Sequence, residues 1–130
     1  MNYHSIMKEY KQVDAVSKVE NADSHEFIQI IYNELITNLK SLSYALKEGP
    51  KVSNIKSKSF SQSLTSIMIL SQSLDFENGE PIASNLFKIY DYCRTTIIKE
   101  YRNCNYEGIN SCIDILEEIN SAWSEIRQRV

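Results

Sequence analysis

The side chains that could perform catalytic or metal chemistry are few in this chain and poorly spaced for it. Its two histidines, His4 and His25, fall before the helical bundle that the rest of the sequence predicts. A phosphotransfer bundle would therefore lack its exposed mid-helix histidine, and the Glu-x-x-His motifs of a di-iron bundle do not occur. The isolated glycines form no phosphate-binding loop, and neither G-x-S-x-G nor H-E-x-x-H is present. The sequence predicts a protein without catalytic residues, metal ligands or a cofactor.

The cysteines lead to the same conclusion. Cys93, Cys104 and Cys112 are odd in number, form no C-x-x-C pair and have no histidine nearby in sequence. This spacing indicates neither a zinc site nor a disulfide framework. We interpret Cys93 and Cys112 as small apolar side chains on helices, and Cys104, between two asparagines, as more exposed.

Composition restricts the fold class and the partners. The 130 residues are enough for one domain with one hydrophobic core. Three glycines and two prolines are too few for the many turns of a β-sandwich or barrel, which favours an all-α chain. A net charge of -3 argues against a nucleic-acid partner. Without a long apolar run or a signal-peptide pattern, the sequence predicts no membrane insertion and a cytoplasmic location.

Apolar residues recur at helical spacing in four segments. The first begins near Asp23 and ends at Gly49-Pro50, and the others begin near Ser53, Pro81 and Tyr106. Asn78-Gly79 is expected to supply positive φ angles in the turn before the third helix. Such short connections favour antiparallel neighbours, so we predict an up-down-up-down four-helix bundle over residues 23–130. Residues 1–22 are predicted to be a mobile N-terminal segment that caps it.

The third helix carries more apolar side chains than a bundle core requires. A second apolar line, interrupted only by Arg94, flanks its core stripe and widens the apolar arc to nearly half of the helix. The second helix adds Ile69, which is expected to point away from the core, and the fourth widens through Ile115, Ala122 and Ile126. Such an excess is typical of a surface that binds a partner or a second copy of the chain. The second line on the third helix comprises Phe87, Tyr90, Ile98 and Tyr101.

Three groups of motifs, taken in order, resemble the FliS family of flagellar export chaperones. Near the start are Tyr10-Lys-Gln-Val13, Asn21-Ala-Asp-Ser-His-Glu-Phe-Ile and Ile31-Tyr32. The middle holds Leu70-Ser-Gln-Ser-Leu-Asp, then Asn78-Gly79, Ile82-Ala-Ser-Asn-Leu86 and Ile89-Tyr-Asp-Tyr92. Near the end, Trp123 follows Ile119 by four residues. The chain departs from the family pattern at Ser24, Asn33 and Asn78, which bears more on the client than on the fold.

The resemblance implies a binding function without turnover. A family member would hold the disordered C-terminal segment of flagellin, prevent its polymerisation and deliver it to the export gate. The segment around Tyr10 and Val13 would lie on the bundle as a displaceable plug over the client surface. Two alternatives remain open from the residues alone. The bundle could serve another secreted or regulatory helical client, or it could be a structural bundle that forms a homodimer when no client is bound.

Overall fold

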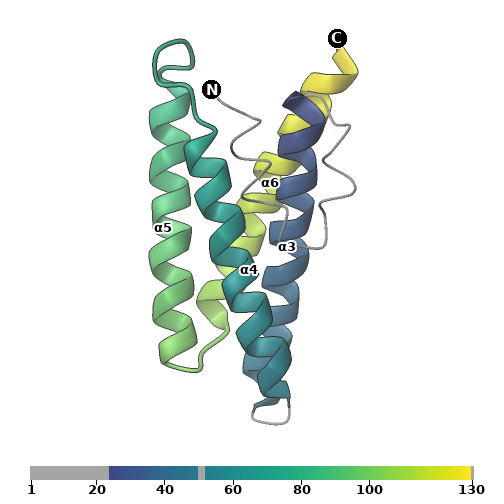
Figure 1. Cartoon of the computed structure of the whole chain (residues 1–130), viewed down its shortest axis with the longest axis vertical. Coiled ribbons are helices and arrows are strands. Elements are labelled where there is room, and N and C mark those ends of the chain that lie inside the picture. The colour runs from purple at the N-terminus through teal and green to yellow at the C-terminus, as the bar shows by residue number, and fades with distance from the viewer. Residues whose placement is uncertain (1–23, 50–51, 130) are drawn as a thin grey trace.

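Residues 24–49 and 52–129 are described by the computed structural model, with side chains described up to Ile126, and they form four helices (Figure 1). The helices are α3 (Ser24–Glu48), α4 (Ser53–Gln72), α5 (Ile82–Arg102) and α6 (Glu107–Arg129). Successive helices run in opposite directions, which confirms the predicted antiparallel all-α bundle. None of these helices is both long and apolar enough to cross a membrane. The expected N-terminal segment, residues 1–22, lies outside the described residues.

Helix α3 is the centre of the bundle. It packs most extensively against α4 and α6, and α5 completes the bundle through smaller interfaces with the same two helices. Apolar residues at helical spacing along α3 face these neighbours, and Ile31, Leu35, Leu39 and Leu42 are fully buried. This stripe was predicted correctly because it is long, regular and almost free of polar interruptions.

Helix α4 packs partly through small polar side chains. Ser59, Ser63 and Ser66 are buried, whereas the apolar Phe60 and Leu64 are only half-buried. Small side chains at a contact let two helices approach closely, which suits the extensive α3–α4 interface. The Ser59 hydroxyl donates a hydrogen bond to the carbonyl oxygen of Ile55 at 2.6 Å. A hydrophobicity pattern could not reveal this face, because its buried positions are not apolar.

The first two turns depend on glycine for different reasons. Gly49 ends α3 with a φ of +87°, and its N–H donates to the carbonyl oxygen of Ala45 at 3.0 Å. The expected positive φ angles at Asn78-Gly79 are wrong, since neither residue adopts one. Gly79 is required by space instead: a Cβ atom there would lie 2.6 Å from the carbonyl oxygen of Asp75.

The third turn connects α5 to α6 through a buried carboxylate. Glu100 is only 5% exposed, and its Oε2 accepts a hydrogen bond from the backbone N–H of Gly108 at 2.9 Å. This bond satisfies one of the free amides at the start of α6 and places negative charge at a helix N-terminus. Between them, Cys104 adopts a φ of +53°, a conformation in which glycine is usual at a helix end, and it is exposed as predicted.

Core truncations should separate the central residues from those at the edge. We expect Leu35→Ala and Leu116→Ala each to lower the free energy of unfolding by about 2–5 kcal/mol, because both side chains are fully buried. Leu86→Ala is a matched control, since Leu86 is half-buried and should cost clearly less. Chemical denaturation monitored by circular dichroism measures all three. Equal losses at the three positions would contradict this distribution of the core.

Candidate binding groove

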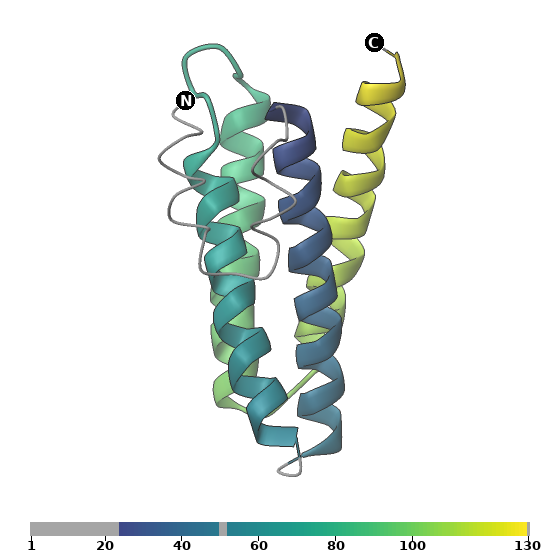
Figure 2. The same ribbon diagram turned by 45° about the vertical axis from the view of Figure 1, so that its right-hand side comes forward.

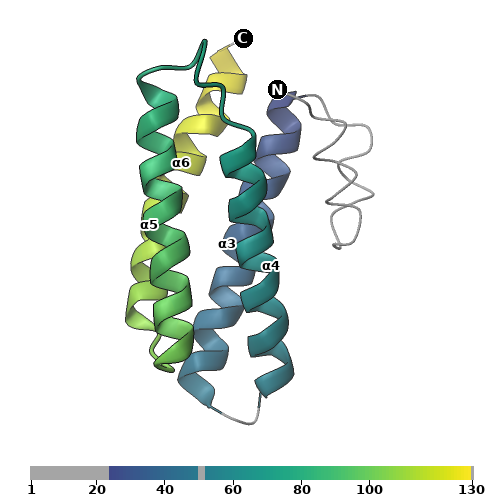
Figure 3. The ribbon, with the colours of Figure 1, turned by 60° about the vertical axis from the view of Figure 1, so that its left-hand side comes forward.

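An apolar groove of about 380 Å³ lies at one end of the bundle. The α4–α5 loop and the C-terminal end of α6 both lie at this end of the bundle (Figure 3). The volume falls in the range of roughly 300–1,000 Å³ that is common for ligand pockets. All four helices contribute apolar side chains to its lining, among them Ile28, Leu70, Leu86, Tyr90, Ile119 and Trp123.

The rim of the groove leaves large apolar side chains in solvent. Ile82 at the start of α5 is 66% exposed, and Ile126 near the end of α6 is 50% exposed. Both side chains line the groove. Exposed aliphatic groups around an apolar hollow are a recognised feature of interaction sites.

Asp75 supplies a carboxylate at the same rim. Its Oδ2 accepts a hydrogen bond from the side-chain amide of Asn78 at 3.1 Å. Its Oδ1 accepts hydrogen bonds from the backbone amides of Glu77 and Asn78 at 3.1 and 3.2 Å. These bonds, the Asn78 side chain first, lower the pKa of Asp75, so it carries a negative charge at neutral pH.

Two tyrosines form a buried pair that contributes to the lining. Tyr32 and Tyr90 are each 2% exposed, and their hydroxyl oxygens lie 2.5 Å apart in a hydrogen bond. Burial raises the pKa of Tyr90 to about 12. Burial, followed by the neighbouring Tyr90, also raises the pKa of Tyr32. Both phenols therefore stay neutral at physiological pH, and their hydrogen bond links α3 to α5 at the groove.

The α6 side of the groove is attached to α3 by His25 and Trp123. The two rings stack almost in parallel, with centroids 4.5 Å apart and an angle of 4° between their planes. The Trp123 indole N–H donates to the carbonyl oxygen of His25 at 3.2 Å. His25 Nε2 lies 2.8 Å from the carbonyl oxygen of Trp123. His25 thus belongs to the first turn of α3, which corrects the expectation that it precedes the bundle.

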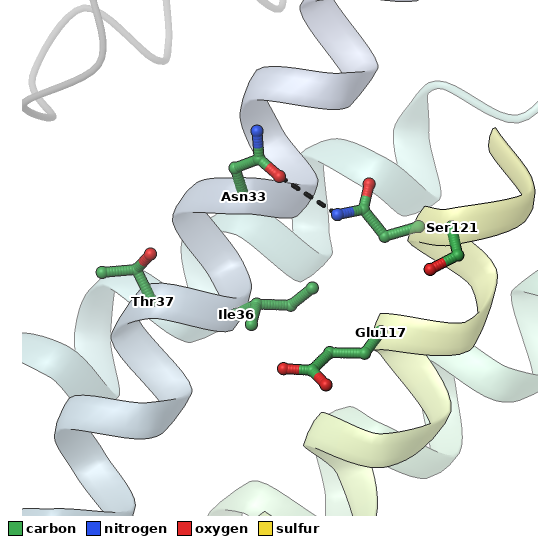
Figure 4. A pocket seen from close by; sticks show the side chains of 6 residues that line it. Asn33, Ile36, Thr37, Glu117 and Ser121 are labelled. Carbon is green, nitrogen blue, oxygen red and sulfur yellow. Dashed lines mark hydrogen bonds between the residues drawn. The ribbon is translucent and has the colours of Figure 1, made fainter. Parts of the chain in front are cut away.

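A second hollow, also of about 380 Å³, lies on the outer face between α3 and α6 and is polar (Figure 4). Figure 4 shows Asn33 pointing toward α6, where its Oδ1 accepts a hydrogen bond from Asn120 Nδ2 at 3.0 Å. The remaining lining residues are Ile36, Thr37, Glu117 and Ser121.

The structure changes the assignment of two residues predicted to bind a partner. Ile69 is fully buried, so the expectation that it points away from the core is wrong. It faces inward because α4 buries a wider arc than its apolar stripe suggests, including the serines beside it. Tyr90 is also buried rather than exposed, although it does line the groove. Tyr10 and Val13 lie outside the described residues.

The other predicted residues lie on the outer surface of α5, away from the groove lining. Phe87 is 47% exposed and meets Phe76 edge-on, with ring centroids 6.1 Å apart. Arg94 is exposed and forms an ion pair with Asp91 at 2.9 Å. Ile98 is half-buried. Tyr101 is half-buried and stacks on Phe60 with a centroid separation of 3.8 Å.

Sequence reasoning missed much of the groove because it assigned the lining residues to the core. Ile28, Leu86 and Ile119 belong to regular apolar stripes, and no local signal distinguishes a stripe residue that faces a hollow from one that faces a side chain. Ala122 and Ile126 were recognised as apolar excess on the fourth helix, and both line the groove.

The described part of the chain contains no group of three or more His, Cys, Asp or Glu side chains that could hold a metal ion. Cys93 and Cys112 are buried in the core, as predicted. An apolar groove with an exposed aliphatic rim on a four-helix bundle is typical of the class of proteins that bind other chains.

Comparison with known proteins identifies the family. The family model described as "Flagellar protein FliS" matches residues 6–130. The chain is 28% identical to the flagellar secretion chaperone FliS of Vibrio cholerae, over 92% of this chain and 87% of that protein. It is also 28% identical to the FliS chaperone of Salmonella typhimurium, over 94% and 90% of the two chains. Identity to the flagellar secretion chaperone FliSB of Pseudomonas aeruginosa is 25%, over 92% and 94%.

The chain therefore belongs to the FliS family. This confirms the resemblance found in the sequence motifs, and it places the chain in a family of secretion chaperones rather than of enzymes.

The tyrosine pair should be visible in the stability of the protein. We expect Tyr90→Phe to cost about 1–3 kcal/mol of unfolding free energy, because it leaves the buried Tyr32 hydroxyl without its partner. The double variant Tyr32→Phe/Tyr90→Phe should cost less than the sum of the single variants. Additive losses in a denaturation experiment would show that the hydroxyl pair is not coupled.

The same pair predicts a loss of stability at high pH. Each folded-state pKa is raised, so the unfolded chain begins to lose its phenol protons near pH 10, while folded Tyr90 keeps its proton until about 12. Titration of these tyrosines should therefore leave the free energy of unfolding unchanged below pH 10. Above pH 10 the free energy of unfolding should fall, by up to ~1.4 kcal/mol per pH unit per tyrosine. Tyr90→Phe should show a shallower fall in denaturation curves between pH 9 and 11.5, and an unchanged slope would contradict the assignment.

Proposed function

We propose that this chain is a cytoplasmic export chaperone that binds the disordered C-terminal segment of flagellin. Binding would withhold that segment from premature polymerisation and keep flagellin in a form suited to flagellar type III export. The proposal rests on family membership together with one observation, the apolar groove with its exposed rim. The export gate is the second partner that this role requires, and no nucleotide, metal or nucleic acid takes part.

The chemistry of the groove suits a helical apolar client. Ile82 and Ile126 remain largely exposed on its rim, so a client that covers them would remove apolar surface from water. An amphipathic helix presents anchors every three or four residues, which is the usual way a peptide fills an apolar groove. A segment that orders only on binding covers a large surface at modest affinity, which favours later release.

The outer surface of α5 is a second candidate for client contact. Phe87, Ile98 and Tyr101 remain proposed contacts, with Arg94 as a polar group among them, because a long segment can extend beyond a groove of this size. The edge-on pair of Phe76 and Phe87 keeps two large aromatic rings about half exposed next to the α4–α5 loop. Ile69 no longer belongs to this set, since a fully buried residue cannot contact a client without rearrangement of the core.

Isothermal titration with a peptide from the C-terminal segment of the same organism's flagellin tests this function. We expect a negative heat-capacity change and a gain of helix in circular dichroism, because binding buries apolar surface and orders the peptide. Ile82→Asp and Ile126→Asp should each weaken binding about tenfold or more with little loss of stability, since both side chains are exposed in the free protein. Ile55→Asp is the matched control: this isoleucine is 45% exposed but does not line the groove.

The remaining outcomes distinguish the alternatives. If Phe87→Asp and Ile98→Asp abolish binding while the groove variants do not, the client contact lies on the outer face of α5. Absence of binding to any flagellin segment by a folded protein would contradict the proposal and favour a chaperone for another helical client. Concentration-dependent self-association that the groove variants abolish would instead favour the self-associating bundle.

The N-terminal segment gives a further prediction. We propose that Tyr10 and Val13 act as a displaceable plug over the client surface. Deletion of residues 1–18 should then leave cooperative unfolding intact while increasing the binding of an apolar-surface dye or promoting dimerisation. Loss of the folded bundle on deletion would show that this segment is part of the core.

A further inference from the structure

The C-terminal half of α6 faces the groove on one side and α3 on the other. Its apolar side chains Ile119, Ala122 and Ile126 line the groove. Asn120 and Ser124, interleaved with them at helical spacing, are hydrogen-bonded to α3. Trp123 belongs to both sides, because its side chain lines the groove and stacks on His25.

The attachment to α3 consists of polar and aromatic contacts. Ser124 Oγ donates to Gln29 Oε1 at 2.8 Å, and the Gln29 side-chain amide donates to Asn120 Oδ1. Asn120 in turn donates to Asn33 at 3.0 Å. We call these bonds the amide ladder. Nearer the N-terminus of α3, His25 and Trp123 stack on each other and share two hydrogen bonds. We call this pair the clasp.

The N-terminal half of α6 is attached differently. Ile109, Cys112 and Leu116 are fully buried in the core, whereas Gln29, Asn120 and Trp123 are only partly buried. Water can replace hydrogen bonds at a partly exposed site, so each contributes little net free energy, but nothing replaces a buried apolar contact. Figure 2 shows the C-terminal end of α6 diverging from the other helices. The N-terminal half of α6 is therefore held by fully buried apolar contacts. The C-terminal half is held by the partly buried Ile119 and Trp123 together with hydrogen bonds that water can exchange.

We propose that the His25–Trp123 clasp and the amide ladder position the C-terminal half of α6 as the adjustable wall of the client groove. The inference rests on the proposed function, because it concerns the same groove. His25, Gln29 and Asn120 are then positioning residues: they act on the client through Ile119, Ala122 and Ile126 rather than by contact. The attached state already has a groove of about 380 Å³, so it is the state that accepts an apolar client.

This assignment fixes the direction of the effect. Weakening the attachment lets the wall sample positions in which the groove is not formed, and the apparent affinity falls in proportion to the population that remains competent. Because fewer free molecules then have a formed groove, the loss should appear mainly as a slower apparent association.

Two measurements on the full chain test the proposal. In hydrogen exchange of the free protein, His25→Ala and Asn120→Ala should each raise exchange across residues 119–126 and leave residues 109–116 protected. In titration with the flagellin peptide, each variant should bind roughly five- to tenfold more weakly, mainly through slower association. The two substitutions together should weaken binding by less than the product of their separate effects, because both release the same wall.

Ser43→Ala is the matched control. Ser43 Oγ donates to Asn110 Oδ1 at 2.6 Å, so it links the same two helices, but near the start of α6 and away from the groove. This variant should change neither exchange at residues 119–126 nor client affinity by more than about twofold. If His25→Ala and Asn120→Ala leave both quantities unchanged, or if Ser43→Ala matches them, the positioning role is wrong.

The exchange measurement separates this inference from the proposed function. A wild-type protein that binds no flagellin peptide would overturn the client assignment, while exchange confined to residues 119–126 would still support the adjustable wall. A wild-type protein that binds the peptide, with clasp variants that bind equally well, would retain the chaperone function and overturn the wall.

Discussion

The packing of α3 against two neighbours at once is the constraint on which the rest of this bundle depends. Its long apolar stripe faces both α4 and α6, with which α3 forms the two most extensive helix–helix interfaces among the described residues. Helix α5 completes the bundle by packing against both α4 and α6 through smaller interfaces. Where its side chains reach across, the core closes around Cys93 and Ile97; where they do not, the groove remains open.

Hydrogen-bonded polar side chains connect the helices near the groove. Leucine and isoleucine from α3 fill much of the centre of the bundle, and α4 adds the buried Ser59, Ser63 and Ser66. Near the open end, Tyr32 and Tyr90 satisfy each other across α3 and α5, and Asn120 finds its partners on α3. Each of these bonds holds a helix where apolar packing is incomplete, so the groove is kept open by directional contacts instead of being filled.

The fold is predicted well because several independent features of the sequence favour the same architecture. Four stripes, few glycines and short connections all favour the same antiparallel bundle, and the helices begin and end close to the predicted residues. The site is predicted less well for a physical reason. Whether Ile69 or Tyr90 is buried depends on how closely two helices approach, and that distance depends on side chains such as Ser63 and Ser66 on the facing surface. Helical periodicity indicates on which side of its own helix a residue lies, but not which residues of the neighbouring helix it faces.

Membership of the FliS family indicates the general role of the protein, and the structure of the groove indicates what kind of binding site serves that role. The family indicates a secretion chaperone, and a chaperone that must release its client cannot rely on a deep, fully enclosed pocket. A groove with an exposed aliphatic rim and a partly hydrated wall meets that requirement, because a client gains apolar burial there without being locked in place. The polar attachment of α6 is then not a defect of packing. Under the proposed function, it is the part of the bundle that another chain would complete.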